Sequence, residues 1–151
     1  MKFKKQEIKL DQLSRLKFDQ KFDIFYKFRF NNDYLKVNID QKKISKKNSK
    51  EWFKENHTKR KLFAIKVNTK IIGLIIYNIN IFFYSITILK SYRNKGIGTI
   101  ALIKFIDILK KKKFKLVTMV KKSNKNSVHL HKKMSKNFIT KNKKFFYFKL
   151  L

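Results

Sequence analysis

Two of the chain's three glycines lie two residues apart, in the hexapeptide Arg93–Gly98. Glycine adopts positive φ without steric cost and lets a ligand approach the backbone closely. An apolar, β-branched run at 84–89 precedes the hexapeptide, and a helical pattern starts near Thr99. This order predicts a strand, a tight turn and a helix. The first amides of such a helix form a binding site for an anion such as phosphate.

Two known phosphate-binding loops were weighed against this spacing. Gly96, Gly98 and Ala101 match the dinucleotide fingerprint formally, but that motif needs an acidic residue about 20 positions later. No Asp or Glu follows Asp107 in the chain. The Walker loop needs Gly-Lys-Ser/Thr, which is absent. A plain strand–helix turn without a ligand remains the simplest alternative.

The hexapeptide resembles the Arg/Gln-x-x-Gly-x-Gly/Ala loop of the GNAT N-acetyltransferases, in which successive amides hold the pyrophosphate of coenzyme A. The third glycine, Gly73, falls inside a predicted strand where these enzymes commonly carry one. The resemblance implies acetyl-CoA as cosubstrate. It also implies that strand residues offer backbone to the pantetheine arm and that the loop holds the pyrophosphate; these residues are Ile86, Thr87, Ile88, Arg93, Asn94, Lys95, Gly96, Ile97, Gly98 and Thr99.

A second stretch supports the same resemblance. The residues from Asn124 to His131 resemble the signature Asn-x-x-Ser/Ala-Ile-x-Leu-Tyr/His, which Gly-Phe normally follows closely. Here Asn137-Phe138 takes that place, and Asn is the next-best residue for positive φ. The resemblance implies that Asn124 contacts the cofactor. It also implies that His131 protonates the departing thiolate, whereas a polar helix residue without a catalytic role is the alternative.

The remaining polar residues identify neither a metal site nor a general base. His129 and His131 are two residues apart and point to different helix faces, so they make a poor metal pair, and no metal is expected. Where many GNAT enzymes place a glutamate, this chain has Ser85 and Met119. Deprotonation would then run through water and backbone, or through a carboxylate of the first third such as Asp33. The sequence leaves both routes open.

The chain's composition predicts a folded, single domain over residues 1–151. At 151 residues and 43% hydrophobic content, it is long and apolar enough to bury a core. It contains no cysteine, so disulfides and thiolate metal sites are excluded. Its first residues contain no apolar signal-peptide region, and a cytoplasmic location is therefore expected.

The formal net charge of +31 raises the alternative of a basic nucleic-acid-binding module. Its lysines, however, are spread along the whole chain and are not confined to a stripe. Lys, Asn, Ile and Phe all have AT-rich codons, so coding bias explains the charge without a specific nucleic-acid partner.

Periodicity predicts the order of the elements. A first strand is expected before Leu16, and an amphipathic helix over 18–30 that ends at Asn31-Asn32. Ser45 is expected to cap a second helix that runs to about Asn56. Strands are expected at 62–67, 71–77, 84–89, 116–120 and 145–148, and a helix from Thr99 that ends in the lysine run 110–113.

The uncharged run from Ile71 to Leu89 has roughly the length of a membrane span. Asn78-Ile79-Asn80 divides it into two β-rich halves, so two buried strands are favoured over a spanning helix. No membrane span is expected.

Together these patterns predict an α/β domain with a GNAT-like mixed, mostly antiparallel central sheet flanked by helices. The predicted function is acetyl transfer from acetyl-CoA by direct attack of an amine. The segment Phe28–Asp33 and the pair Trp52-Phe53 resemble GNAT enzymes that acetylate nucleotide-linked amino sugars, although on residues alone the pair is an ordinary apolar helix face. Other acceptors remain open: a protein N-terminus, a ribosomal protein or a polyamine. So does a GNAT fold that binds CoA without catalysis.

Overall fold

A seven-stranded sheet organises the computed structural model, which describes residues 3–4, 7–30, 43–135 and 137–151. The strand order is β1-β2-β3-β4-β5-β7-β6, and every neighbouring pair is antiparallel except β4 and β5. The strands are β1 (Ile8–Gln12), β2 (Arg60–Val67), β3 (Lys70–Asn78), β4 (Phe83–Ile88), β5 (Val117–Lys121), β6 (Asn137–Thr140) and β7 (Phe145–Lys149).

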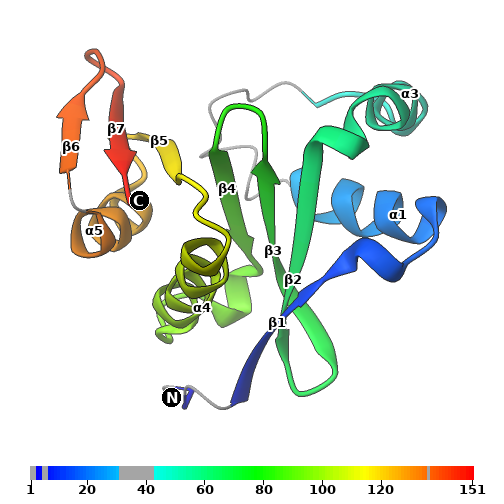
Figure 1. Cartoon of the computed structure of the whole chain (residues 1–151), viewed down its shortest axis with the longest axis horizontal. Coiled ribbons are helices and arrows are strands. Elements are labelled where there is room, and N and C mark those ends of the chain that lie inside the picture. Colours follow the sequence, from blue (N-terminus) through cyan, green and yellow to red (C-terminus); the bar gives the residue numbers. More distant parts are fainter. Residues whose placement is uncertain (1–2, 5–6, 31–42, 136) are drawn as a thin grey trace.

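In the part of the chain that the structure describes, two pairs of α-helices cover the sheet (Figure 1). The helices α1 (Phe18–Arg29) and α3 (Lys46–Asn56) lie beside β2, β3 and β4 on one face, and α4 (Ile97–Lys111) and α5 (Lys125–Met134) lie against the other. The mixed, mostly antiparallel sheet flanked by helices confirms the predicted fold class.

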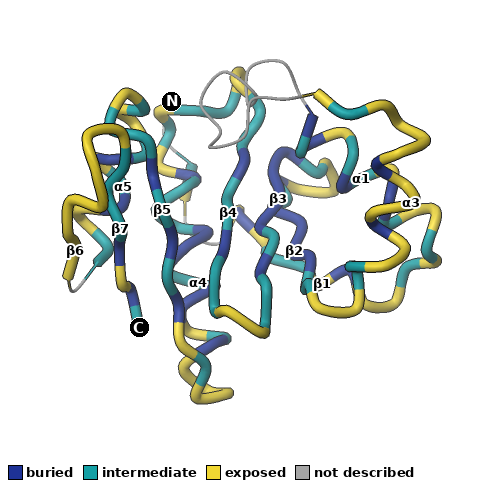
Figure 2. Tube along the Cα trace, turned by 90° about the horizontal axis from the view of Figure 1, so that it is seen from above, coloured by how far each residue is buried: buried dark blue, intermediate teal, exposed yellow. Residues whose placement is uncertain are grey.

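Strand alternation explains why two separate cores form. Along β2, Leu62 and Ala64 point toward the phenylalanines of α1 and α3, while Phe63 and Ile65 point toward α4. Both faces of the central strands are therefore apolar, which explains the uncharged run from Ile71 to Leu89. Figure 2 shows β2 and β3 largely buried, β4 mostly of intermediate burial, and β6 exposed at the sheet edge.

The uncharged run forms β3 and β4, as two strands were predicted to do. Within the described ranges, no helix is long and apolar enough to span a membrane. Gly73 allows β3 to lie close to β4, because a Cβ atom there would lie 2.6 Å from the Thr87 carbonyl oxygen. The glycine in this strand therefore has a packing role.

The N-cap predicted for α3 is present. Ser45 Oγ accepts a hydrogen bond from the Asn48 amide at 3.2 Å, and α3 ends at Asn56 as expected. The helix α4 begins at Ile97, two residues before the predicted start, because Gly96 already takes the left-handed conformation that precedes it. α1 ends at Arg29, and Asn31-Asn32 lie outside the described residues.

One prediction of backbone conformation was wrong. Asn137 does not have positive φ; it is the first residue of β6, a short edge strand that pairs with β7. Positive φ occurs instead at Asn68, Phe82, Asn94, Gly96 and Lys113. After α5, Ser135 is extended with φ −87° and ψ 148°, and residue 136 lies outside the described residues.

Candidate functional site

The strands β4 and β5 diverge immediately after they meet. They share one registered pair in the described structure, Phe83 with Val117. The Val117 amide donates to the Phe82 carbonyl at 2.9 Å. One residue further along, the hydrogen bond between the two strands comes from a side chain, because Thr118 Oγ1 donates to the Tyr84 carbonyl at 2.8 Å. Beyond Tyr84, the edge of β4 no longer pairs with β5 and can contact a ligand.

The loop after β4 leads directly into the N-terminus of α4. Arg93 Nε donates to the Ile88 carbonyl at 2.8 Å, which ties the loop to the end of the strand. Asn94 has φ 59° and Gly96 has φ 78°, and both are left-handed. Among the described residues, no heavy atom lies within 4 Å of the Cβ position of Gly96, and no side chain caps α4, whose N-cap is Gly96 itself. The first turn of α4 therefore presents its amides and the positive end of its dipole.

The N-terminus of α5 lies near this loop. Asn124 is its N-cap, and Asn124 Oδ1 accepts a hydrogen bond from the Ser127 amide at 3.2 Å. Gly98 allows the two helices to pack closely, because a Cβ atom there would lie 3.2 Å from Leu130 Cδ2 and 3.5 Å from Ile88 Cδ1. The close approach of α4 and α5 therefore depends on this glycine.

These parts enclose a cavity of about 340 Å³, here called the loop cavity. Ten of the eleven predicted cofactor-binding residues line it: Ile86, Thr87, Ile88, Arg93, Asn94, Gly96, Ile97, Gly98, Thr99 and Asn124. The exception is Lys95, whose Nζ donates to the Ser91 carbonyl at 2.7 Å. The remaining lining residues were not predicted: Tyr92, Asn126, Ser127, His129, Leu130 and Lys133. Their spacing along α5 was the available signal, since 126, 129, 130 and 133 share one helical face.

The two histidines of α5 occupy different environments. His129 is exposed and lines the loop cavity, while His131 is 2% exposed and lies between the rings of Tyr84 and Phe148. His131 Nδ1 lies 2.7 Å from the Ser127 carbonyl oxygen. A carbonyl only accepts hydrogen bonds, so Nδ1 carries the proton and, in the neutral ring, Nε2 has the lone pair.

Burial lowers the pKa of His131 below its usual value, and the Ser127 hydrogen bond only partly opposes this effect. The imidazole is therefore mainly neutral near pH 7. His131 Nε2 and the Tyr84 hydroxyl are both buried and have no hydrogen-bond partner in the described part of the chain. Tyr84 directly precedes the β4 residues at the open edge, and neither Tyr84 nor His131 is among the residues that line the loop cavity.

No carboxylate lines the loop cavity among the residues that the structure describes. Asp107 is exposed on α4, and Asp33 lies outside the described residues. Ser85, at one of the two positions considered for a base, lines a different cavity on the α1–α3 side of the sheet.

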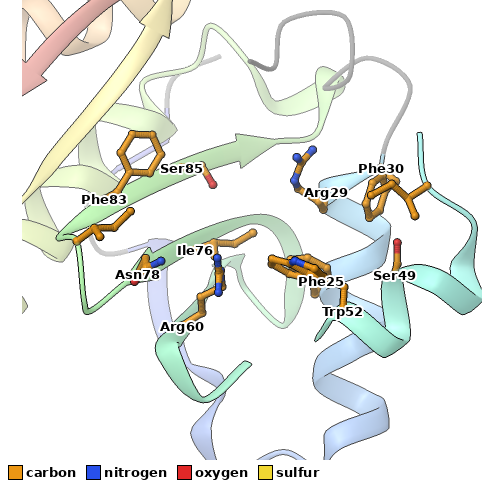
Figure 3. Close-up of a pocket in the computed structure, with 12 residues that line it drawn as sticks. Phe25, Arg29, Phe30, Ser49, Trp52, Arg60, Ile76, Asn78, Phe83 and Ser85 are labelled. Carbon is orange, nitrogen blue, oxygen red and sulfur yellow. The ribbon is translucent and has the colours of Figure 1, made fainter. Parts of the chain in front are cut away.

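This second cavity, here called the arginine cavity, has a volume of about 330 Å³. α1, α3 and strands β2 to β4 contribute its walls, which contain two arginines, four aromatic side chains and no carboxylate among the described lining residues. Figure 3 shows Arg29, Arg60, Trp52 and Ser85 around a common space. Sequence reasoning assigned no role to Arg60, because nothing near it in sequence marks a site.

Comparisons with known proteins point to the same family that the sequence motifs resemble. The sequence profile of the acetyltransferase (GNAT) family matches residues 24–135. Among curated proteins, none matches significantly.

Several solved structures share the fold. The spermidine N-acetyltransferase from Vibrio cholerae in complex with CoA and spermine superposes with a TM-score of 0.73 at 15% identity, covering 96% of each chain. The Campylobacter jejuni N-acetyltransferase PseH in complex with acetyl coenzyme A gives 0.65 at 22% identity, over 95% of this chain and 97% of that one. A domain from Methanocaldococcus jannaschii gives 0.74 at 18% identity, over 93% and 96%.

Proposed function

This chain belongs to the GNAT family of N-acetyltransferases, and we propose that it transfers the acetyl group of acetyl-CoA directly to the amine of a small molecule. The observation that carries the proposal is the loop cavity itself. One space joins the uncapped N-terminus of α4 to the edge of β4 that β5 leaves unpaired. An anionic, elongated ligand with a peptide-like arm matches both ends of this space.

Acetyl-CoA is the cosubstrate, and the residues present fit it. The amides of Gly96 to Thr99 face the cavity without a capping side chain, and such helix N-termini bind phosphate groups. Arg93 and Lys133 add positive charge to the same wall. The backbone of Ile86, Thr87 and Ile88 is available to pair with the amide groups of the pantetheine arm. Asn124 supports the site by capping α5.

Acetyl-CoA supplies an activated acetyl thioester, and the acceptor's neutral amine forms the new C–N bond as the C–S bond breaks. The amine must first lose its ammonium proton, which goes to solvent. The second proton, released from nitrogen on attack, must reach the departing sulfur. His131 Nε2 accepts this proton because its ring is neutral and Nδ1–H is held by Ser127. It then donates the proton to the thiolate, which is the general-acid role expected of this position.

We favour a nucleotide-linked amino sugar as the acceptor, on the basis of the stretch Phe28–Asp33 and the pair Trp52-Phe53. Two further observations support this choice: Trp52 and Phe30 line the arginine cavity, and its described walls carry positive charge. Asn31 to Asp33 lie outside the described residues. A polyamine such as the spermine bound by the Vibrio cholerae relative would need carboxylates, and the described walls of both cavities contain none.

Calorimetric titration with acetyl-CoA and with CoA tests the proposal. We expect saturable binding of one molecule per chain at 150 mM salt, with an affinity that Gly98→Val removes. Weak heat that disappears as salt is raised would instead indicate nonspecific attraction of a polyanion to a +31 protein. A DNA complex that is sequence-selective and survives the same salt would favour the nucleic-acid-binding alternative.

A further inference from the structure

The arginine cavity has the features of a ligand-binding site. Four large apolar side chains are exposed in the described structure, and two of them lie at this cavity: Trp52 (40%) and Ile81 (60%). The other two, Phe138 and Ile139, are in β6 at the far edge of the sheet. Exposed apolar surface that gathers around a hollow marks a binding site more often than scattered apolar residues do.

A buried polar atom supports this interpretation independently. Ser49 lines the cavity from α3 and is only 1% exposed, yet Ser49 Oγ has no hydrogen-bond partner among the described residues. Figure 3 shows the Ser49 hydroxyl beside Phe30 at the cavity wall. A buried hydroxyl without a partner costs free energy unless a ligand or water satisfies it.

One wall of the cavity is a stack of planar groups. The Arg60 guanidinium lies 4.6 Å from the Trp52 ring centroid, and Trp52 stacks on Phe25 at 5.9 Å with an angle of 17° between the planes. Phe25 in turn stacks on buried Phe53 at 4.8 Å. Arg60 Nη1 also donates to the Asn56 carbonyl at 3.2 Å. These contacts hold the guanidinium and the indole in place before any ligand arrives.

The charge of the cavity is one-sided. Arg29 and Arg60 both line it, and its other described lining side chains are neutral. Burial lowers the pKa of Arg60, which shows that the guanidinium has lost part of its hydration. Paired arginines with planar guanidinium groups match the oxygens of phosphate better than any neutral group does.

We propose that the arginine cavity binds the acceptor and selects an amine that carries a phosphate group and a planar ring, as in a nucleoside diphosphate derivative. Arg29 and Arg60 hold the phosphates, Ser49 Oγ binds a polar atom of the ligand, and the Trp52 stack receives the ring. The inference rests on the proposed function, since it assigns the acceptor of that same reaction. It adds to the proposed reaction an acceptor site that selects its ligand by charge.

The position of the cavity suits this role. Phe83 and Ser85 of β4 line the arginine cavity, and the next residues of the strand, Ile86 to Ile88, line the loop cavity. One strand therefore forms part of both walls. An acceptor anchored by its phosphates at Arg29 and Arg60 can extend its amine along β4 toward the point where β5 diverges.

The single tryptophan of the chain provides the test, because its fluorescence reports on this cavity alone. The protein is first saturated with CoA, so that the phosphate site of the loop cavity is filled. Uridine diphosphate, uridine and spermidine are then titrated at 150 mM salt. We expect uridine diphosphate to change Trp52 fluorescence saturably, uridine to bind at least tenfold more weakly, and spermidine to cause no saturable change.

Matched variants separate the site from general charge attraction. Arg60→Gln and Arg29→Gln should each weaken uridine diphosphate binding about tenfold or more, since each removes a hydrogen-bonded charge. Lys110→Gln removes the same charge from an exposed position on α4 that lines neither cavity, and should leave the affinity unchanged. Arg29→Gln also keeps the test decisive if Arg60→Gln fails to fold.

The proposal is overturned if all three variants bind uridine diphosphate equally, because the attraction is then general. It is also overturned if uridine diphosphate gives no saturable change, or if spermidine binds as tightly. In each case, normal CoA binding by calorimetry would leave the proposed acetyl transfer standing. Loss of CoA binding in the wild-type protein would contradict the proposed function itself.

Discussion

The two cavities along β4 are built from different parts of the polypeptide. Backbone contributes much of the loop cavity: helix amides, a strand edge and two glycines come from the continuous segment 86–99, and α5 supplies another wall. Side chains dominate the arginine cavity, and they come from α1, α3 and the consecutive strands β2, β3 and β4. Under the proposed function, the loop cavity binds CoA, which is the same in every such reaction, and the arginine cavity binds the acceptor, which can differ.

This difference predicts how each cavity responds to substitution. A site made of amides is lost when the backbone moves and tolerates the loss of individual side chains. A site made of side chains loses affinity stepwise as each is truncated. Substitutions at the glycines and histidines around the loop cavity test this contrast.

Gly98→Val should abolish measurable acetyl-CoA binding. A Cβ atom alone would reach within 3.2 Å of Leu130 Cδ2, and the two further methyl groups of valine force α4 away from α5 and β4. Titration calorimetry measures the loss, and circular dichroism checks that the fold is retained. Gly98→Ala is the matched control, because a flexible leucine end can yield to one methyl group. Wild-type affinity in Gly98→Val would contradict the assignment of the loop.

His131→Ala should lower kcat by about 10²–10⁴-fold with little change in acetyl-CoA affinity, because it removes a proton carrier and no ligand contact. His131→Tyr should recover part of the rate. His129→Ala is the control: it lines the loop cavity, so it should change acetyl-CoA affinity modestly and leave kcat near wild type. If steady-state assays show undiminished kcat in His131→Ala, the thiolate takes its proton from water.

Gly73→Ala should lower the free energy of unfolding by about 3 kcal/mol, the upper end of the usual cost of overpacking. The added methyl group would lie 2.6 Å from the backbone oxygen of Thr87, which cannot rotate away. Urea unfolding measures the change. Gly96→Ala is the control: nothing lies within 4 Å, so only the strain of positive φ remains, at about 1 kcal/mol. If both variants lost the same free energy of unfolding, β4 would have moved to accommodate the methyl group at position 73.

Stability should fall as the pH is lowered below about 6.5, and the His131→Gln variant should show less of this loss. The pKa of His131 is lowered in the folded state, so the unfolded chain binds the proton more readily. The contribution is complete above pH 6.5 and is lost as pH falls toward the lower folded pKa. Thermal melts across pH 5 to 8 measure it, and identical profiles for both proteins would contradict it.

Much of the fold follows from local sequence. Alternating and continuous apolar runs predict β2, β3, β4, β5 and β7, since each strand must bury at least one face. Ser45 and Asn124 mark helix starts because their side chains bond amides three residues later. The observed start of α4 at Ile97 lies two residues before the predicted start, because the left-handed Gly96, and not the hydrophobic periodicity, sets it.

The sequence alone predicted ten of the residues that line the loop cavity, because they belong to one strand–loop–helix segment and to the start of α5, both of which local motifs mark. The other residues of the two cavities come together only through tertiary packing. The rotation of α5 about its axis exposes His129 to the loop cavity and buries His131, and packing against β4 and β7 sets that rotation. Arg29, Trp52 and Arg60 meet only because α1 and α3 pack on the same face of the sheet. No short-range pattern encodes that meeting, since each of these residues satisfies its own helix or strand equally well without the others.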